Sequence, residues 1–388
     1  MSNQRGRRGE NTARAGDDRP GHPGSADPDA RRPDGGRPDG GHPALDRQRP
    51  DPEGPSIGDL GEFGLIAELA ARMRPGPGTV VGIGDDAAVL AAPDGRVVAT
   101  TDFLLEGRHF RRDWAGPADI GHRAAVRSLA DVAAMGAVAT ALLVAFAAPA
   151  DLPASWALGV ADGLAAESAR AGASVAGGDV ARFGTVLLAV TGLGDLQGRN
   201  PVTRSGARPG DVVAVAGPLG RSAAGLALIE AGLTDPAGTG VPDRSAEMAW
   251  LAGLVRAHLR PAPPYDAGPQ AATLGATAMI DVSDGLLADL GHVADASGVA
   301  IDVRTAALDT APLEPAVRAL RASAPGAPGP TALGWVLTGG EDHSLVATFP
   351  PGVPLPARWL VIGAVRAGHD VLVDGRAYSA APGWDHFR

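Results

Sequence analysis

The sequence Gly82-Ile83-Gly84-Asp85-Asp86-Ala87-Ala88-Val89 places two adjacent carboxylates between a glycine pair and a short apolar run. Glycine lets a ligand approach the backbone without a side chain in the way. Neighbouring aspartates repel each other unless a positive charge lies near both, and a divalent cation that prefers oxygen ligands can supply it. A surface turn is the alternative interpretation, because Gly and Asp are also turn residues.

The same pattern of an apolar run, glycine or hydroxyl residues and a carboxylate recurs in both halves of the chain. Its further occurrences are Val97 to Asp102, Ser174 to Asp179, Ala278 to Asp284 and Trp335 to Asp342. We expect each apolar run to be a strand, and ligands of α/β sheets gather beyond strand ends. The recurrence therefore predicts one acidic crevice, in which carboxylates and substrate phosphates bind Mg²⁺.

Composition excludes several classes of function. The chain has 388 residues, 45% of them apolar, and a formal net charge of -10, which argues against nucleic acid or an anionic membrane surface as a partner. It has no cysteine, which excludes thiolate metal sites and cysteine nucleophiles. All 34 basic residues are arginine, so a P-loop lysine, a protein-kinase lysine and Schiff-base chemistry are excluded too.

Other enzyme classes lack their motifs. The nine histidines show no H-E-x-x-H spacing, and no G-x-S-x-G elbow is present, which disfavours zinc sites and serine hydrolases. A glycosidase needs only two carboxylates. Phosphoryl transfer needs positioning and charge neutralisation rather than a covalent nucleophile, so it suits this chain. No apolar run reaches the length of a membrane span and no signal core opens the chain, so we expect a cytoplasmic protein.

The chain divides into a tail and two predicted domains. Residues 1–55 are rich in Gly, Pro, Asp and Arg and are predicted to be disordered. Strands and helices then alternate, which predicts an α/β layer structure with domains at 56–197 and 198–388. The polar segment 195–209 is the predicted linker, 234–246 and 308–331 are predicted loops, and 335–338 is a predicted strand.

Several residues keep two interpretations at this point. Helix 120–135 places Ala125, Leu129 and Val132 on one face, with Asp131 on another face one turn after Arg127. An ordinary i, i+4 ion pair between Arg127 and Asp131 is the simpler interpretation. His109 is more often a surface residue than a ligand. Asp284 is either a ligand or the cap of the helix through Ser297.

The motifs together resemble thiamine-monophosphate kinase over all of the chain except its tail. They are GEFGLI at 61–66, GIGDDAAV at 82–89, TTD at 100–102, HF at 109–110, SLADVAAMGA at 128–137, AGGD at 176–179, TRSGARPGD at 203–211, MIDVSDGL at 279–286, TGGED at 338–342 and WDHF at 384–387. Each motif alone is weak, whereas their number and order are specific.

This resemblance implies a fold, a reaction and a set of ligands. The fold is the α/β (α+β) two-domain fold of aminoimidazole-ribonucleotide synthetase, with a mixed sheet and packed helices in each domain. The reaction is Mg²⁺-dependent transfer from ATP to thiamine monophosphate, giving thiamine diphosphate, in a homodimer that binds several Mg²⁺ ions. Implied metal ligands are Asp86, Thr100, Thr101, Asp102, Asp131, Asp179, Asp281 and Asp284. Implied ATP contacts are Gly178, Asp179, Arg204 and Ser283. Implied substrate contacts are His109, Glu341 and Trp384.

The resemblance also leaves two other functions open. The family has Tyr-Glu where His343 and Ser344 follow Asp342 in this chain. This departure lies at the substrate end of the predicted site. The alternatives are a fold relative that uses ATP to activate another acceptor, and a non-catalytic nucleotide-binding regulator.

Overall fold

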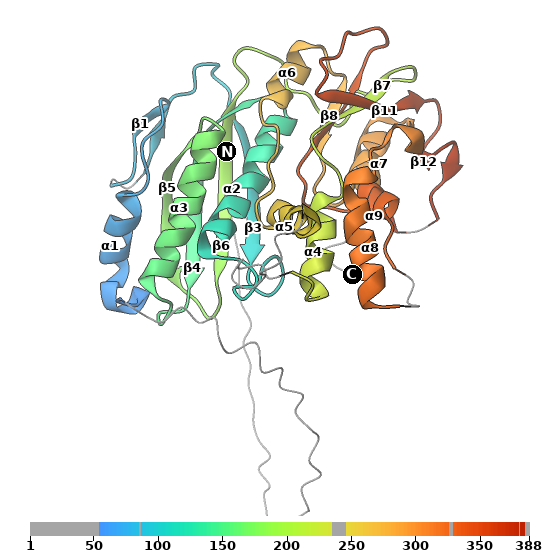
Figure 1. Cartoon of the computed structure of the whole chain (residues 1–388). Coiled ribbons are helices and arrows are strands. Elements are labelled where there is room, and N and C mark those ends of the chain that lie inside the picture. The colour runs from blue at the N-terminus through green and yellow to red at the C-terminus, as the bar shows by residue number, and fades with distance from the viewer. Residues whose placement is uncertain (1–53, 85–86, 235–245, 326–328, 380, 385–388) are drawn as a thin grey trace, which may run out of the picture. The chain divides into compact units, whose positions relative to one another are not determined.

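A computed structural model describes residues 54–84, 87–234, 246–325, 329–379 and 381–384 (Figure 1). These residues belong to one compact unit, Arg47–Arg388. Of the predicted tail, only residues 54 and 55 are among the described residues. Asp86 is not among them either. Within these ranges no helix is both long and apolar enough to cross a lipid bilayer. We call residues 54–197 the N-terminal half and residues 198–384 the C-terminal half.

A four-stranded sheet forms the centre of the N-terminal half, with helices α2 and α3 on one face (Figure 1). The strand order is β3-β6-β4-β5, with β4 and β5 parallel and the other pairs antiparallel. The elements of this half are α1 (Ile57–Ala70), β1 (Thr79–Val81), β2 (Val89–Leu90), β3 (Val98–Leu105), α2 (Pro117–Ala134), β4 (Val138–Ala148), α3 (Ala154–Arg170), β5 (Ser174–Arg182) and β6 (Leu187–Asp195).

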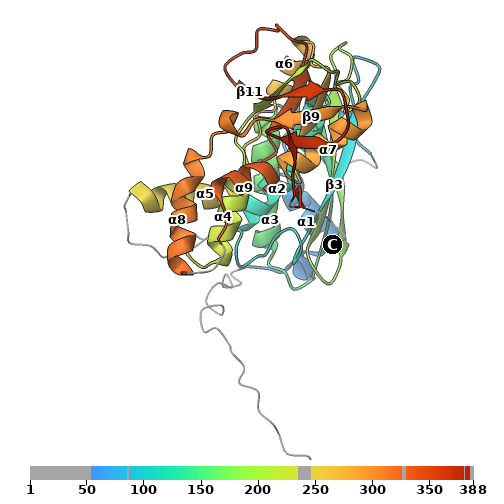
Figure 2. The same ribbon diagram turned by 90° about the vertical axis from the view of Figure 1, so that its right-hand side faces the viewer.

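A seven-stranded sheet forms the centre of the C-terminal half, in the order β13-β12-β9-β11-β7-β10-β8. Its strands are β7 (Val212–Ala216), β8 (Ala278–Asp281), β9 (Ala300–Val303), β10 (Leu345–Phe349), β11 (Trp359–Arg366), β12 (Val371–Val373) and β13 (Arg376–Ala377). The helices are α4 (Arg221–Glu230), α5 (Ala246–Leu259), α6 (Ala267–Thr273), α7 (Leu286–Ser297), α8 (Glu314–Ser323) and α9 (Ala332–Thr338). Helices α4, α5 and α8 lie together, away from β9 and β11 (Figure 2).

Both faces of the seven-stranded sheet are buried at β7, β8, β9 and β10, which explains the uninterrupted apolar runs of these strands. In β7, Val213 and Val215 enter the larger hydrophobic cluster, whereas Ala214 and Ala216 enter a smaller one. The smaller cluster includes Ala133 at the end of α2, so this helix of the N-terminal half packs against the C-terminal half. These contacts bring strand β8 close to helix α2.

The structure corrects two predictions about secondary structure. Residues 335–338 form the end of helix α9 and not a strand. The side chain of Thr331 accepts a hydrogen bond from the Gly334 amide and so caps this helix, and a short apolar run does not distinguish a helix from a strand by its periodicity. The predicted loop 308–331 contains helix α8, which has a proline in its first turn as helix starts often do.

Strands β3 and β5 run past the carboxylates that were expected to end them. Asp102 lies in the middle of β3, because the residues after it continue to pair with β6 as far as Leu105 and Leu187. Asp179 likewise lies inside β5, which pairs with β4 as far as Arg182. In this sheet the acidic residues are therefore presented by strand faces rather than by strand ends.

Candidate active site

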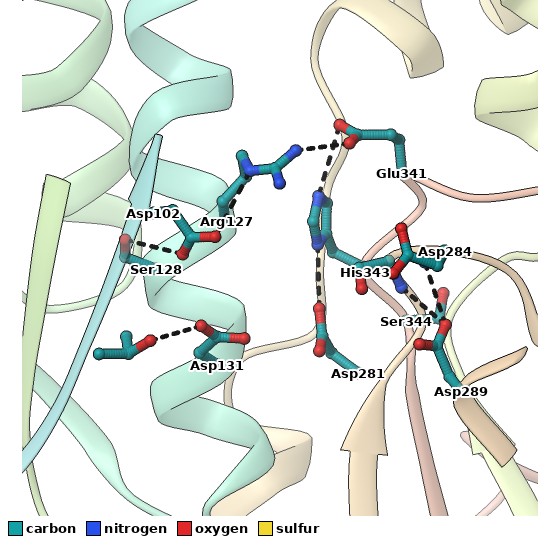
Figure 3. A network of polar contacts seen from close by, with 12 residues as sticks. Asp102, Arg127, Ser128, Asp131, Asp281, Asp284, Asp289, Glu341, His343 and Ser344 are labelled. Carbon is teal, nitrogen blue, oxygen red and sulfur yellow. Dashed lines mark hydrogen bonds and ion pairs between the residues drawn. The ribbon is translucent and has the colours of Figure 1, made fainter. Parts of the chain in front are cut away.

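Four predicted metal ligands from both halves, three of them carboxylates, lie in one region (Figure 3). Asp102 comes from β3, Asp131 from α2 and Asp281 from the last position of β8. Thr100 donates a hydrogen bond of 2.6 Å from Oγ1 to Oδ2 of Asp131. Ser128 Oγ lies 3.2 Å from Oδ2 of Asp102. The alternation of β3 turns Thr100 and Asp102 toward the same side, so that they meet α2.

The electrostatics of this region favour a bound cation. Burial, followed by the negative charges of Asp281 and Asp102, raises the pKa of Asp131 to about 7. The three carboxylates therefore repel one another at neutral pH, and a divalent cation would relieve that repulsion. The predicted ion pair between Arg127 and Asp131 does not form, because Arg127 pairs with Asp102 and Glu341 instead.

The donor set suits Mg²⁺ held partly by phosphate rather than by a closed protein cage. Within the described ranges, no three Asp, Glu, His or Cys side chains are grouped closely enough to hold a metal ion by themselves. Mg²⁺ is usually bound by one or two carboxylates, with waters and substrate phosphates as the other ligands. Asp86, the remaining acidic candidate before β3, lies outside the described residues.

Two predicted ligands of the N-terminal half lie apart from this group. Thr101 faces the opposite side of β3, where it accepts a hydrogen bond of 3.2 Å from Thr191. Asp179 lies on β5, at the edge of the sheet opposite to β3. Strands β6 and β4 lie between them, and their pairing places Asp102 level with Gly178, the neighbour of Asp179. Three strand spacings of roughly 4.8 Å put the two strands about 14 Å apart, so one chain cannot bind a single ion through both aspartates.

A cluster of basic groups lies beside the carboxylates. Arg123 Nη2 and Arg127 Nη1 donate to the two carboxylate oxygens of Glu341 at 2.9 and 2.5 Å. His343 lies between Glu341 and Asp281, and its Nδ1 is 3.0 Å from Asp281 Oδ2. Burial opposes the imidazolium, but the hydrogen bond to Asp281 and the charge of Glu341 outweigh it and raise the pKa of His343 to about 10. Burial likewise opposes ionisation of Glu341, yet Arg127, His343 and Arg123 hold its pKa well below the ordinary value.

All three predicted substrate contacts line one pocket of about 510 Å³. These are His109, Glu341 and Trp384, and the predicted ligands Ser283 and Asp284 line the same pocket. Its wall also contains Arg108, whose guanidinium carbon lies 5.2 Å from the ring centroid of the half-exposed Trp384. His109 is oriented by the Leu105 amide, which donates to its Nδ1 at 3.0 Å. The pocket thus offers an aromatic face, cationic groups and carboxylates to a ligand.

The loop at the start of α7 is held by Asp289, which the sequence analysis did not identify. Its Oδ2 accepts hydrogen bonds of 3.0, 3.2 and 3.1 Å from the amides of Ser283, Asp284 and Gly285. The capping role expected of Asp284 thus falls to Asp289, while the Asp284 carbonyl accepts from the Trp384 amide at 2.9 Å. The sequence did contain a signal for Asp289, because a carboxylate in the first turn of a helix is favourably placed beside the free amides there.

Two further buried residues lie near the pocket. Asp342 was expected to belong to the acidic group, and His258 was not identified from the sequence. Asp342 points to the start of α4, where it accepts from the amides of Gly220 and Ser222 at 2.5 and 2.9 Å. Burial raises the pKa of Asp342 to about 7. Because its carboxylate binds the amides at the start of α4, Asp342 caps this helix and does not belong to the acidic group. His258 contacts the Ser222 hydroxyl at 3.0 Å, and burial lowers its pKa to about 3, so it is a neutral group in the pocket wall.

The predicted ATP contacts do not converge in this chain. Gly178 and Asp179 line a separate apolar cavity of about 110 Å³ between α1, α3 and the four-stranded sheet. Arg204 is exposed, and its carbonyl accepts a hydrogen bond of 2.8 Å from Ser297 at the end of α7. Ser283 alone of this set lies in the larger pocket.

Most of the chain matches known protein families. Residues 84–196 match the family model for the N-terminal domain of AIR synthase related proteins, and residues 208–325 match the model for the C-terminal domain. The thiamine-monophosphate kinase of Mycobacterium tuberculosis is 47% identical over 338 residues, which cover 86% of this chain and 94% of that protein.

Solved structures give the same result. The crystal structure of thiamine-monophosphate kinase from Stenotrophomonas maltophilia has a TM-score of 0.67 and 33% identity, covering 82% of this chain and 98% of that one. The structure of AaThiL complexed with AMPPCP and TMP has a TM-score of 0.65 and 30% identity, covering 84% and 97%. The sequence, the two-sheet fold and the relatives thus agree, and the chain belongs to the thiamine-monophosphate kinase family.

Proposed function

We propose that this protein transfers the γ-phosphoryl group of ATP to the phosphate of thiamine monophosphate, giving thiamine diphosphate and ADP. One observation carries the proposal: the pocket lined by His109, Glu341 and Trp384 adjoins the carboxylates of both halves, through Glu341, His343 and Asp281. The similarity to AaThiL, whose structure holds AMPPCP and TMP, supports both substrates.

The chain's own residues would perform the transfer by positioning. Asp102 and Asp131 would hold one Mg²⁺ ion on the nucleotide and Asp179 a separate one, and Asp86 and Asp281 would hold further ions toward the acceptor. Thr100, Thr101 and Asp284 complete the proposed metal ligands, and Gly178, Arg204 and Ser283 the proposed ATP contacts. Bound Mg²⁺ would neutralise the charge of the phosphates. Because both substrates supply their own reacting oxygens, a direct in-line transfer needs no covalent nucleophile.

The pocket chemistry fits the acceptor. Thiamine carries a cationic thiazolium ring and an aminopyrimidine ring, and the exposed face of Trp384 can stack on such rings. His109, on the same wall, can contact the phosphate or the ring substituents. These contacts would orient the acceptor phosphate toward the carboxylate group.

We further propose a cytoplasmic homodimer. Phe103 is 57% exposed on the face of β3 opposite to α2, and Phe183, next to the end of β5, is 55% exposed. Ala99 and Thr101 on the same face of β3 are exposed too, and we place the interface on this face. Sedimentation of the purified chain and of Phe103→Asp tests this, since the variant should be a monomer.

The decisive assay combines purified protein, ATP, Mg²⁺ and thiamine monophosphate and detects thiamine diphosphate directly. Product formation that requires all three additions supports the proposal. ATP binding without product would favour a nucleotide-binding regulator. ADP release with a different acceptor would favour another enzyme of the same fold.

A further inference from the structure

Five side chains form a continuous series of contacts between the two halves at the candidate site (Figure 3). Arg127 lies with Nε 3.7 Å from Asp102 Oδ1 and with Nη1 2.5 Å from Glu341 Oε1. His343 lies with Nε2 3.8 Å from Glu341 Oε2 and with Nδ1 3.0 Å from Asp281 Oδ2. Carboxylates thus alternate with a guanidinium and an imidazole, and the series ends at two proposed metal ligands, one on β3 and one on β8.

We propose that Arg127, Glu341 and His343 are positioning residues that fix the separation of Asp102 and Asp281 for the metal-bound phosphates. The inference rests on the proposed function and deepens it, since it assigns roles to the residues between the two carboxylates. It also changes the role of Glu341. Because each oxygen of this carboxylate already accepts from Arg123 or Arg127, Glu341 acts through its neighbours and not as a substrate contact.

Burial supports a positioning role. The side chains of Arg127, His343 and Asp281 are 11%, 2% and 6% exposed. A charge that is removed from water is costly unless a partner lies beside it, so Arg127 and His343 each depend on their two neighbours in the series. The orientation of Asp281 is therefore coupled to that of Asp102, although the two lie on different sheets.

The backbone under this series is also specialised. Glu341 and His343 both adopt the left-handed region, with φ of 65° and 53°, which non-glycine residues rarely do. Such backbone conformations persist only where contacts with the surrounding structure hold them in place. Here the amides of Glu341 and His343 donate to the carbonyls of Ser283 and Val282 at 2.8 and 2.9 Å. The segment is thus bound to the end of β8, which carries Asp281.

The test measures binding of Mn²⁺ to the full-length protein in the presence of inorganic phosphate, which supplies the phosphate ligands, by the loss of the free Mn²⁺ electron paramagnetic resonance signal. Glu341→Gln and His343→Asn should each weaken Mn²⁺ binding about tenfold, the usual effect of losing an outer-shell partner. In the product assay both should lower kcat, with KM for thiamine monophosphate within about twofold of the wild type. Arg127→Met should behave in the same way, and Arg127→Lys should recover part of the Mn²⁺ affinity because it keeps the charge.

The chain contains a matched control network outside the site. Glu167 contacts His122 at 3.1 Å, Arg170 at 2.5 Å and Tyr265 at 2.6 Å, and its side chain is 2% exposed. Glu167→Gln removes a buried, paired carboxylate too, but it should lower only the melting temperature and leave Mn²⁺ affinity per folded molecule unchanged. A decrease of Mn²⁺ affinity in this control would show that the site variants act through general destabilisation, and it would overturn the proposal.

Three outcomes separate this inference from the proposed function. If wild-type protein forms thiamine diphosphate but folded Glu341→Gln and His343→Asn bind Mn²⁺ normally, the positioning role is wrong and the function stands. If Glu341→Gln raises only KM for thiamine monophosphate, Glu341 is a substrate contact and the proposal is again wrong. If wild-type protein forms no thiamine diphosphate while the variants still lose Mn²⁺ affinity, the proposed function fails and the positioning role stands.

Discussion

Arg127 of helix α2 donates a 2.5 Å hydrogen bond to Glu341, a residue 214 positions later in the chain. The contact explains why α2 is central to the site, since the same helix carries Asp131 and Ser128. It also replaces the i, i+4 ion pair that was expected between Arg127 and Asp131. An i, i+4 partner at Asp131 was available to Arg127, but Arg127 pairs instead with Glu341, a partly buried carboxylate from the other half, and with Asp102. Buried charges need close partners, whereas an exposed helical pair contributes only about 0.5 kcal/mol or less.

The first prediction concerns Asp102 on β3. Asp102→Asn should lower kcat for thiamine diphosphate formation at least about 100-fold, because it removes a charge that would hold a metal at the phosphates. The Mg²⁺ concentration needed for half-maximal rate should rise as well. Initial rates over an Mg²⁺ series measure both effects. Asp266→Asn, which removes an exposed partner of Arg358, is the matched control and should be near wild type. Near-normal turnover of Asp102→Asn would contradict the metal role.

The second prediction concerns pH and Asp131. The folded-state pKa of Asp131 is about 7 against 3.8 for the free residue, so the folded protein binds this proton more tightly than the unfolded chain. Its contribution to stability is therefore complete below about pH 4 and is lost as pH rises through about 7. In EDTA, Asp131→Asn should gain on the order of 2 kcal/mol relative to wild type between pH 5 and pH 8.

Urea unfolding at pH 5, 6.5 and 8 measures this difference. Asp289 and Asp342 also have pKa values near 7, and they contribute equally to both proteins, so only the difference reports Asp131. The asparagine keeps an oxygen for the Thr100 hydroxyl, which limits other effects. Parallel stability curves for the two proteins would show that burial and the charges of Asp281 and Asp102 do not raise the pKa of Asp131.

Sequence reasoning succeeded where the signal was local. The apolar face of α2, with Leu129 and Val132 fully buried, and the helix from Leu286 to Ser297 are both confirmed. Of the recurring carboxylates, Asp102 and Asp281 come from different halves and share one region, whereas Asp179 and Asp342 lie apart from them. The family was also recognised correctly from the order of the motifs.

The parts that failed depend on contacts distant in sequence or on capping. The apolar run at Trp335 is compatible with a strand or a helix until the cap at Thr331 is included. The pairing of His343 with Asp281, 62 residues earlier, is set by the packing of β10 on β8. The left-handed backbone at Glu341 leaves no trace in residue type, and the carboxylate of Asp289 in the first turn of α7 indicates a helix start but not the three amides that it holds.

The third prediction concerns Asp289. Asp289→Ala leaves three buried or half-buried amides of the 283–285 loop without their acceptor, so we expect a loss of about 3 kcal/mol in the free energy of unfolding. Because Ser283 and Asp284 line the pocket, KM for thiamine monophosphate should also rise. Asp309→Ala is the control: it removes the acceptor of one exposed amide, that of Ala311, and should change stability by less than about 0.5 kcal/mol. Equal effects of the two variants in urea unfolding would argue against a special role for Asp289.

The last prediction concerns Trp384, which is 57% exposed and lies beside Arg108 in the pocket wall. A half-exposed indole next to a guanidinium presents an aromatic face that can exchange one cation for another, and the thiazolium ring of thiamine is such a cation. Trp384→Ala should therefore raise KM for thiamine monophosphate about tenfold, equivalent to about 1.4 kcal/mol, and leave KM for ATP unchanged. Trp384→Phe should recover part of the loss, since it keeps a smaller aromatic face. Trp250 is 45% exposed and donates to the Pro312 carbonyl outside the pocket, so Trp250→Ala serves as the control and should keep both constants. If Trp384→Ala changes KM for ATP instead, the pocket binds the nucleotide and the acceptor must bind elsewhere.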